Sequence, residues 1–243
     1  MNALDNTLLA ALASAGLNLA VALPVFVLAV KQAKPRRPWL LGLFAAVNIL
    51  EWFVLMMPRH GPFVRLDWNW QGKLLEIAWP ALLFFVVPGL TLAHLGLRVR
   101  PAPGSWKPLL LAGAAALGIS AFLLPHMGGH PDRETLLFEL SMPGLGEELV
   151  FRGAFQSLLN EVFGKPWRIL GAELGWGFVI STLLFTTGHG LLMTPDLRVR
   201  FVPFAMLPAL LLGPILGWMR ERSGSIWPCI LVHNTVDTLT LFL

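Results

Sequence analysis

Long stretches without charged residues dominate this chain. Five of them contain no Asp, Glu, Lys or Arg: residues 6–30, 77–97, 108–131, 174–195 and 201–219. Three more apolar stretches contain a few charges: 39–57 with Glu51, 140–160 with Glu147, Glu148 and Arg152, and 223–243 with Asp237. Since a helix needs about 20 apolar residues to cross a bilayer, the pattern predicts an all-α polytopic membrane bundle. We expect about eight transmembrane helices in a single domain over residues 1–243.

The composition excludes most soluble domains. Only 13% of the 243 residues are charged, 56% are apolar, and the mean hydropathy is +0.67, whereas soluble proteins carry about 25% charged residues. The net charge of +4 comes from short loops between apolar runs, so we expect no nucleic-acid binding. The single cysteine, Cys229, excludes an intramolecular disulfide and a multi-cysteine metal site.

The loops differ in their content of basic residues. One alternating set contains Lys31, Lys34, Arg36, Arg37, Arg98, Arg100, Lys107, Lys165, Arg168, Arg220 and Arg222, and the other contains Arg59, Arg65, Lys73, Arg133, Arg198 and Arg200. The positive-inside rule places the larger set in the cytoplasm. The prediction is a multi-pass protein of the bacterial plasma membrane with both termini extracytoplasmic.

Glu147, Glu148, Arg152 and Asp237 lie inside expected spans, where an ionised group costs roughly 2.5–3.5 kcal/mol. Glu148 and Arg152 are four residues apart and can pair on one helical face. Glu147 lies about 100° further around that helix, so it is expected to be free for another task. Pro143 and Gly144 suggest a bend or a helix start just before it.

Two further pairs share the same spacing. Phe185 precedes His189 by four residues, and His233 precedes Asp237 by four, so each pair shares a helical face. A carboxylate at that spacing can orient an imidazole for acid–base chemistry or metal binding. Because three such motifs occur in separate spans, we expect a catalytic core within residues 140–240.

The motifs resemble those of the CAAX-protease and bacteriocin-processing family of intramembrane endopeptidases, also called the Abi or type II CAAX prenyl endopeptidase family. Glu147-Glu148-x-x-x-Arg152, Phe185-x-x-x-His189 and His233-x-x-x-Asp237 correspond in order to its E-E-x-x-x-R, F-x-x-x-H and H-x-x-x-(N or D) motifs. The Ser225–Pro228 segment also resembles the usual start of the last motif.

The resemblance implies a glutamate-dependent peptidase. Glu147 would be the general base that activates water, Glu148 and Arg152 would position the motif, and His189 would orient or polarise the water. His233 and Asp237 would bind the oxyanion, although an ionised Asp237 could not donate a hydrogen bond as Asn does. Asp237 would then be protonated, orient His233 or ligate a metal.

The cofactor remains open at this stage, as either none obligatory or a divalent metal such as zinc. If a metal is present, Glu147, His189 and His233 form a plausible ligand set, and Glu148 is the remaining candidate base. The chain has no tyrosine for a Tyr-Asp aspartyl site and no G-x-S-G segment for a serine nucleophile.

The expected partners are the lipid bilayer and a membrane-associated peptide or protein, which we expect to be an exported substrate reached from the extracytoplasmic side. Other classes of function stay open. A non-catalytic immunity or scaffold protein could use the charges for packing, and a proton-coupled transporter could use them as a relay. A bis-histidine haem protein would draw on His94, His126, His189 and His233.

Overall fold

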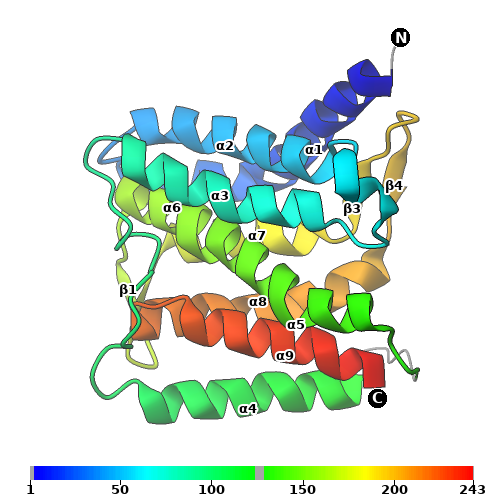
Figure 1. Cartoon of the computed structure of the whole chain (residues 1–243). Coiled ribbons are helices and arrows are strands. Elements are labelled where there is room, and N and C mark those ends of the chain that lie inside the picture. Colours follow the sequence, from blue (N-terminus) through cyan, green and yellow to red (C-terminus); the bar gives the residue numbers. More distant parts are fainter. Residues whose placement is uncertain (1–2, 124–128, 243) are drawn as a thin grey trace.

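The computed structural model describes residues 3–123 and 129–242, which form a helical bundle (Figure 1). The helices are α1 (Ala3–Gln32), α2 (Trp39–Met56), α3 (Trp70–Val86), α4 (Trp106–Leu123), α5 (Arg133–Glu148), α6 (Gln156–Phe163), α7 (Trp176–Gly188), α8 (Pro203–Ser223) and α9 (Trp227–Phe242). A short 3₁₀ helix, η1 (Gly61–Arg65), precedes α3, and a π-helical segment, η2 (Leu149–Phe155), joins α5 to α6 without a break. The expected all-α fold is confirmed.

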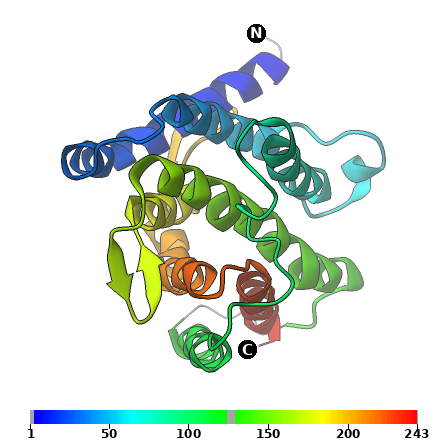
Figure 2. The same cartoon turned by 90° about the vertical axis from the view of Figure 1, so that its left-hand side faces the viewer.

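The helices alternate in direction, and α1 begins at the same end of the bundle at which α9 ends (Figure 1). α1, α2 and α3 form one layer, while α8, α9 and α4 lie on the opposite side (Figures 1 and 2). The continuous α5–η2–α6 helix crosses between these layers. It contacts α9 and α3 through α5, and α2 and α7 through α6. Its residues therefore face the interior of the bundle.

The third and fifth helices begin earlier than the hydropathy pattern predicts. The expected span 77–97 is instead α3, which begins after Asn69, whose side chain accepts a hydrogen bond from Gly72 N at 3.1 Å. The fifth helix begins after Asp132, which accepts from Thr135 N at 2.7 Å. Both are N-caps. The expected helix start at Pro143 is wrong, because this proline lies inside α5.

The helix expected over residues 174–195, which is α7 in the structure, is shorter than expected. α7 ends at Gly188, and the predicted helical residues beyond His189 instead enter β3 (Leu191–Met193), which pairs antiparallel with β4 (Val199–Phe201). β3 also binds α1, because Ser14 Oγ accepts from Met193 N at 2.8 Å. A second hairpin, β1 (Trp167–Ile169) with β2 (Ala172–Leu174), follows α6. The hydropathy pattern did not predict either hairpin.

The bundle places apolar groups outside and many polar groups inside. Large exposed apolar side chains include Phe85, Leu110, Leu111, Phe122, Phe204 and Leu231. Three helices are long and apolar enough to cross a membrane: Asn6–Gln32, Trp39–Met56 and Pro203–Ser223. Shorter apolar helices cover Trp106–Phe122 and Trp176–Gly188. These features support an integral membrane protein, while the expected number of eight spans stays a prediction.

Candidate active site

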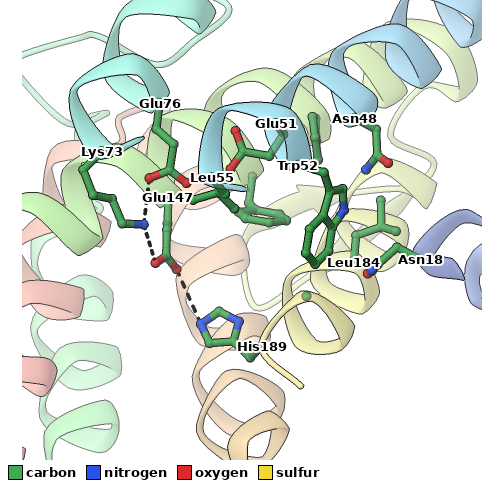
Figure 3. Close-up of a pocket in the computed structure, with 13 residues that line it drawn as sticks. Asn18, Asn48, Glu51, Trp52, Leu55, Lys73, Glu76, Glu147, Leu184 and His189 are labelled. Atoms are coloured by element: carbon green, nitrogen blue, oxygen red, sulfur yellow. Dashed lines mark hydrogen bonds and ion pairs between the residues drawn. The ribbon is translucent and has the colours of Figure 1, made fainter. Parts of the chain in front are cut away.

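Glu147 lies on α5 and points toward α3, where Lys73 meets it (Figure 3). Lys73 Nζ lies 2.8 Å from Glu147 Oε1 and 2.7 Å from Glu76 Oε2. Arg152 pairs with Glu148 on the same helix, as expected, but the sequence did not predict that Glu147 would have a basic partner from another helix. This partner leaves the second carboxylate oxygen, Glu147 Oε2, without a hydrogen bond.

Both histidine motifs meet this second oxygen. His189 Nε2 lies 3.5 Å from Glu147 Oε2, and His233 Nε2 lies 3.9 Å from the same atom. His189 directly follows the last turn of α7, and its Nδ1 lies 2.6 Å from the carbonyl oxygen of Phe185. This contact with a carbonyl acceptor puts the proton on Nδ1 and directs Nε2 toward Glu147.

Glu148 occupies a drier position than Glu147. Its Oε1 lies 3.1 Å from Arg152 Nη1 and 2.8 Å from His233 Nδ1, and the Glu148 side chain is fully buried. Because an ionised carboxylate only accepts hydrogen bonds, this contact places a proton on His233 Nδ1 and turns Nε2 toward Glu147. Glu148 thus orients an imidazole and is shielded from water.

Arg152 connects the first motif to two other helices. Its guanidinium carbon lies 3.9 Å from the centre of the Phe185 ring, and its Nη2 donates to Gly213 O on α8 at 3.2 Å. The cation–π contact and the ion pair with Glu148 together fix the arginine in the interior. Arg152 and Phe185 therefore stabilise the position of Glu148 and do not contact Glu147.

Asp237 lies one turn after His233, with Oδ2 at 3.4 Å from His233 Nε2. Its side chain is 28% exposed, more than any other acidic group of the site. The neighbouring Asn234 accepts a hydrogen bond from Gly144 N at 2.7 Å and joins α9 to α5. The carboxylate of Asp237 is thus placed beside the imidazole that its sequence spacing predicted.

Sequence reasoning missed the contribution of α3 and α2. The prediction that Lys73 is a loop residue is wrong, because it lies inside α3, and no sequence motif indicated Glu51 or Glu76. Glu51 accepts from Trp79 Nε1 at 3.0 Å, and its side chain lies beside Glu76 (Figure 3). Asn69 as an N-cap and Pro88-Gly89 as a stop were the available signals that Lys73 lies within a helix.

Two cavities meet at His189. The first has a volume of about 170 Å³ and is lined by Lys73, Glu76, Glu147 and His189, with Trp52 and Asn48 further along (Figure 3). The second, of about 260 Å³, lies among α7, α8 and α9 beside His233 and Asp237, and its remaining lining is mostly apolar, including Ala209, Leu212 and Val236. Water can therefore reach Glu147 and His189 from the first cavity, and an apolar peptide segment can reach His189 and His233 from the second.

The residues do not fit the metal or haem alternatives well. Among the described residues, no three His, Cys, Asp or Glu side chains form a group suited to a metal ion, and Glu147 is already bound by an ammonium group. His94 lies near Glu161 on α6, away from the two site histidines. The fourth haem candidate, His126, lies outside the described residues.

Comparison with known proteins gives one family and one curated relative. Residues 134–239 match the family described as "Type II CAAX prenyl endopeptidase Rce1-like". A segment of 76 residues is 29% identical to aquaporin NIP3-1 of Arabidopsis thaliana, covering 28% of this chain and 24% of the aquaporin. The chain therefore spans less than two thirds of that relative. No solved structure gives a significant match.

The family match contains all three motifs, which the structure brings together around Glu147. The predicted resemblance is confirmed over this region. Residues 134–239 are therefore similar to the Rce1-like, type II CAAX prenyl endopeptidase family.

Proposed function

We propose that this protein is an intramembrane endopeptidase that cleaves a membrane-associated peptide or protein with a water molecule activated by Glu147. The match of residues 134–239 to a protease family supports peptide-bond hydrolysis. The observation that carries the proposal is the convergence of His189 Nε2 and His233 Nε2 on the unpaired oxygen of Glu147, at 3.5 and 3.9 Å. At these distances the two imidazoles and the carboxylate can move slightly to contact a water molecule between them.

The proposed reaction begins when Glu147 takes a proton from water and the water oxygen attacks the scissile carbonyl carbon. The negative charge that develops on the carbonyl oxygen is stabilised by the Nε2–H groups of the two imidazoles in their cationic form, in which Nδ1 still donates to Phe185 O or to Glu148. His233 is held for this role by Glu148. When the C–N bond breaks, Glu147 returns the proton to the departing amine. No step depends on a metal ion.

The substrate would enter through the cavity among α7, α8 and α9. The wall formed by Ala209, Leu212 and Val236 suits an apolar side chain, and the polar wall that includes Lys73 and Glu147 lies on the other side of His189. An extended peptide crossing between the two would expose its carbonyl carbon to Glu147. We further propose that the substrate is an exported, membrane-bound peptide or protein.

The test is the isosteric change Glu147→Gln, which keeps the side-chain shape and removes the base. We expect cleavage to fall by about 10²-fold or more, with the protein still folded. The measurement compares peptide termini in membranes of cells that express either form. Uncut substrate should accumulate in the variant.

Glu173→Gln is the matched control, because Glu173 is an exposed residue on β2 whose side chain is 71% accessible. This variant should cleave like the parent. Unchanged peptide termini with Glu147→Gln would instead support the immunity or scaffold alternative, and proton-coupled flux in liposomes would support a transporter.

A further inference from the structure

A second polar site surrounds Arg220, near the end of α8. Arg220 is only 7% exposed. Its Nη2 donates to His94 O at 2.6 Å, while its Nε has no hydrogen-bond partner. Within residues 3–123 and 129–242, no carboxylate forms an ion pair with it. A buried guanidinium without a direct ion pair is costly, so the position favours an anion.

The acidic groups near Arg220 are already paired. Glu221 accepts hydrogen bonds from Gln156 and Asn160 at 2.7 Å each, and its other oxygen faces Lys165 at 3.2 Å. Glu161 faces Arg37 at 3.2 Å. Arg98, on the loop before α4, likewise has no ion pair with the carboxylates described. Two guanidinium groups therefore remain for a ligand.

Both arginines line one cavity of about 280 Å³, together with Lys165, Gly224 and the paired carboxylates of Glu161 and Glu221. Arg98 Nη1 reaches toward Gly224, at 3.8 Å from where a Cβ on that glycine would lie. The cavity thus carries cationic groups from a loop, from the end of α8 and from the segment after α6.

The loop that carries Arg98 is fixed in place. Ser157 Oγ donates to His94 O at 2.6 Å, and Ser225 Oγ donates to Arg98 O at 2.6 Å. Gly96 has φ +77°, and a Cβ there would lie 2.6 Å from the guanidinium of Arg220. Only glycine adopts this conformation easily and leaves space for the arginine. The site is therefore preformed.

The cavity lies at the end of the bundle toward which Figure 2 looks, where α6 ends and α9 begins. This end carries the larger set of basic loop residues, at the expected level of lipid headgroups. Planar guanidinium groups match phosphate oxygens in geometry and charge, and basic pockets at helix ends bind phospholipid headgroups. We propose that Arg98 and Arg220 bind the phosphate group of a membrane phospholipid in this cavity.

The test measures thermal unfolding of the full chain in a neutral detergent during titration with phosphatidylglycerol. A ligand that binds the folded state raises the unfolding temperature. Diacylglycerol with the same acyl chains lacks the phosphate and should give no comparable shift. Inorganic phosphate distinguishes the two sources of the same chemistry: a shift with the lipid alone identifies a headgroup, and an equal shift with both identifies a general phosphate site.

The variant Arg98→Gln removes one proposed phosphate contact from an exposed position, so folding should survive. We expect its apparent affinity for phosphatidylglycerol to fall about tenfold or more. Arg100→Gln, an exposed change two residues along the same loop, should leave the affinity unchanged. Equal stabilisation by diacylglycerol, or full affinity in Arg98→Gln, would overturn the proposal. Native mass spectrometry of retained lipid provides the second measurement.

Discussion

At the scale of single residues, Lys73 stabilises the ionised carboxylate of Glu147, the proposed general base, inside the bundle. Glu76 is buried and the Glu147 side chain is 16% exposed, and the same ammonium group contacts both carboxylates. It thereby offsets their mutual repulsion and leaves Glu147 Oε2 directed toward the histidines. Lys73 acts through Glu147, so it is a positioning residue in the proposed mechanism.

Replacing Lys73 with Met should leave two carboxylates without their cation. We expect the free energy of unfolding to fall by about 3–5 kcal/mol, as when one partner of a buried ion pair is removed, and the cleavage rate to fall as well. Denaturant unfolding and kcat/KM measure the two effects. Lys73→Arg keeps the charge and should recover most of the stability.

Lys107→Met is the matched control, since Lys107 is exposed at the start of α4. It should change neither stability nor cleavage. If Lys73→Met retained the unfolding free energy and kcat/KM of the parent, the role assigned to Lys73 would be wrong.

The sequence pattern predicted most of the site residues, but it did not predict the role of Lys73. Glu148 and Arg152, and His233 and Asp237, are each four residues apart and meet on one helical face, so spacing alone could predict those pairs. Lys73 and Glu147 are 74 residues apart on different helices. Their contact depends on how α3 packs against α5, which no local pattern records.

At the scale of elements, the close approach of α5 and α9 brings the first motif to the last. Gly144 N donates to Asn234 Oδ1, and Asn234 Nδ2 donates to Ser141 O at 3.3 Å. A Cβ at Gly144 would lie 2.6 Å from Asn234 Oδ1 and 2.9 Å from Ile230 O. The absence of a side chain thus allows Glu148 to reach His233.

Gly144→Ala should therefore push α9 away from α5. We expect a loss of about 1–3 kcal/mol in unfolding free energy, typical of overpacking, and slower cleavage because the contact between Glu148 and His233 lengthens. Gly118→Ala is the control, because no atom lies within 4 Å of its Cβ position on α4. It should be neutral or stabilising by about 0.5–1 kcal/mol.

Equal stability in the two glycine variants would contradict this account of the α5–α9 contact. Unfolding midpoints and kcat/KM, measured side by side in the same detergent, compare them directly.

Hydropathy predicted these elements better than their ends. It found the apolar part of every helix, because burial and lipid contact both select apolar residues. It failed at α3, where the charged residues Lys73 and Glu76 lie in the first two turns of the helix, and at α7, where apolar residues of β3 continue past His189. A short apolar strand and a helical turn cannot be separated by hydropathy alone.

At the scale of the whole molecule, the bundle separates its loops into two groups at opposite ends. The loops after α1, α3, α6 and α8 lie at one end. The loops after α2 and α7 and the segment 129–132 before α5 lie at the other end, where α1 begins and α9 ends (Figure 1). Because Lys73 and Arg220 are both buried helical residues, neither counts as a loop charge. Each set then loses one member, and the first end still carries about twice as many basic residues as the second, which favours a cytoplasmic position for the first end.

This orientation can be measured with introduced cysteines. Cys229 is fully buried and its thiol donates to Leu216 O, so the parent chain should not react with a membrane-impermeant maleimide. Asp196→Cys, in the exposed turn between β3 and β4, should react in intact cells. Lys34→Cys, in the exposed loop after α1, should react only after the membrane is opened. Because His189 lies just before β3, the reverse labelling would turn the site toward the cytoplasm and exclude an exported substrate approaching from outside.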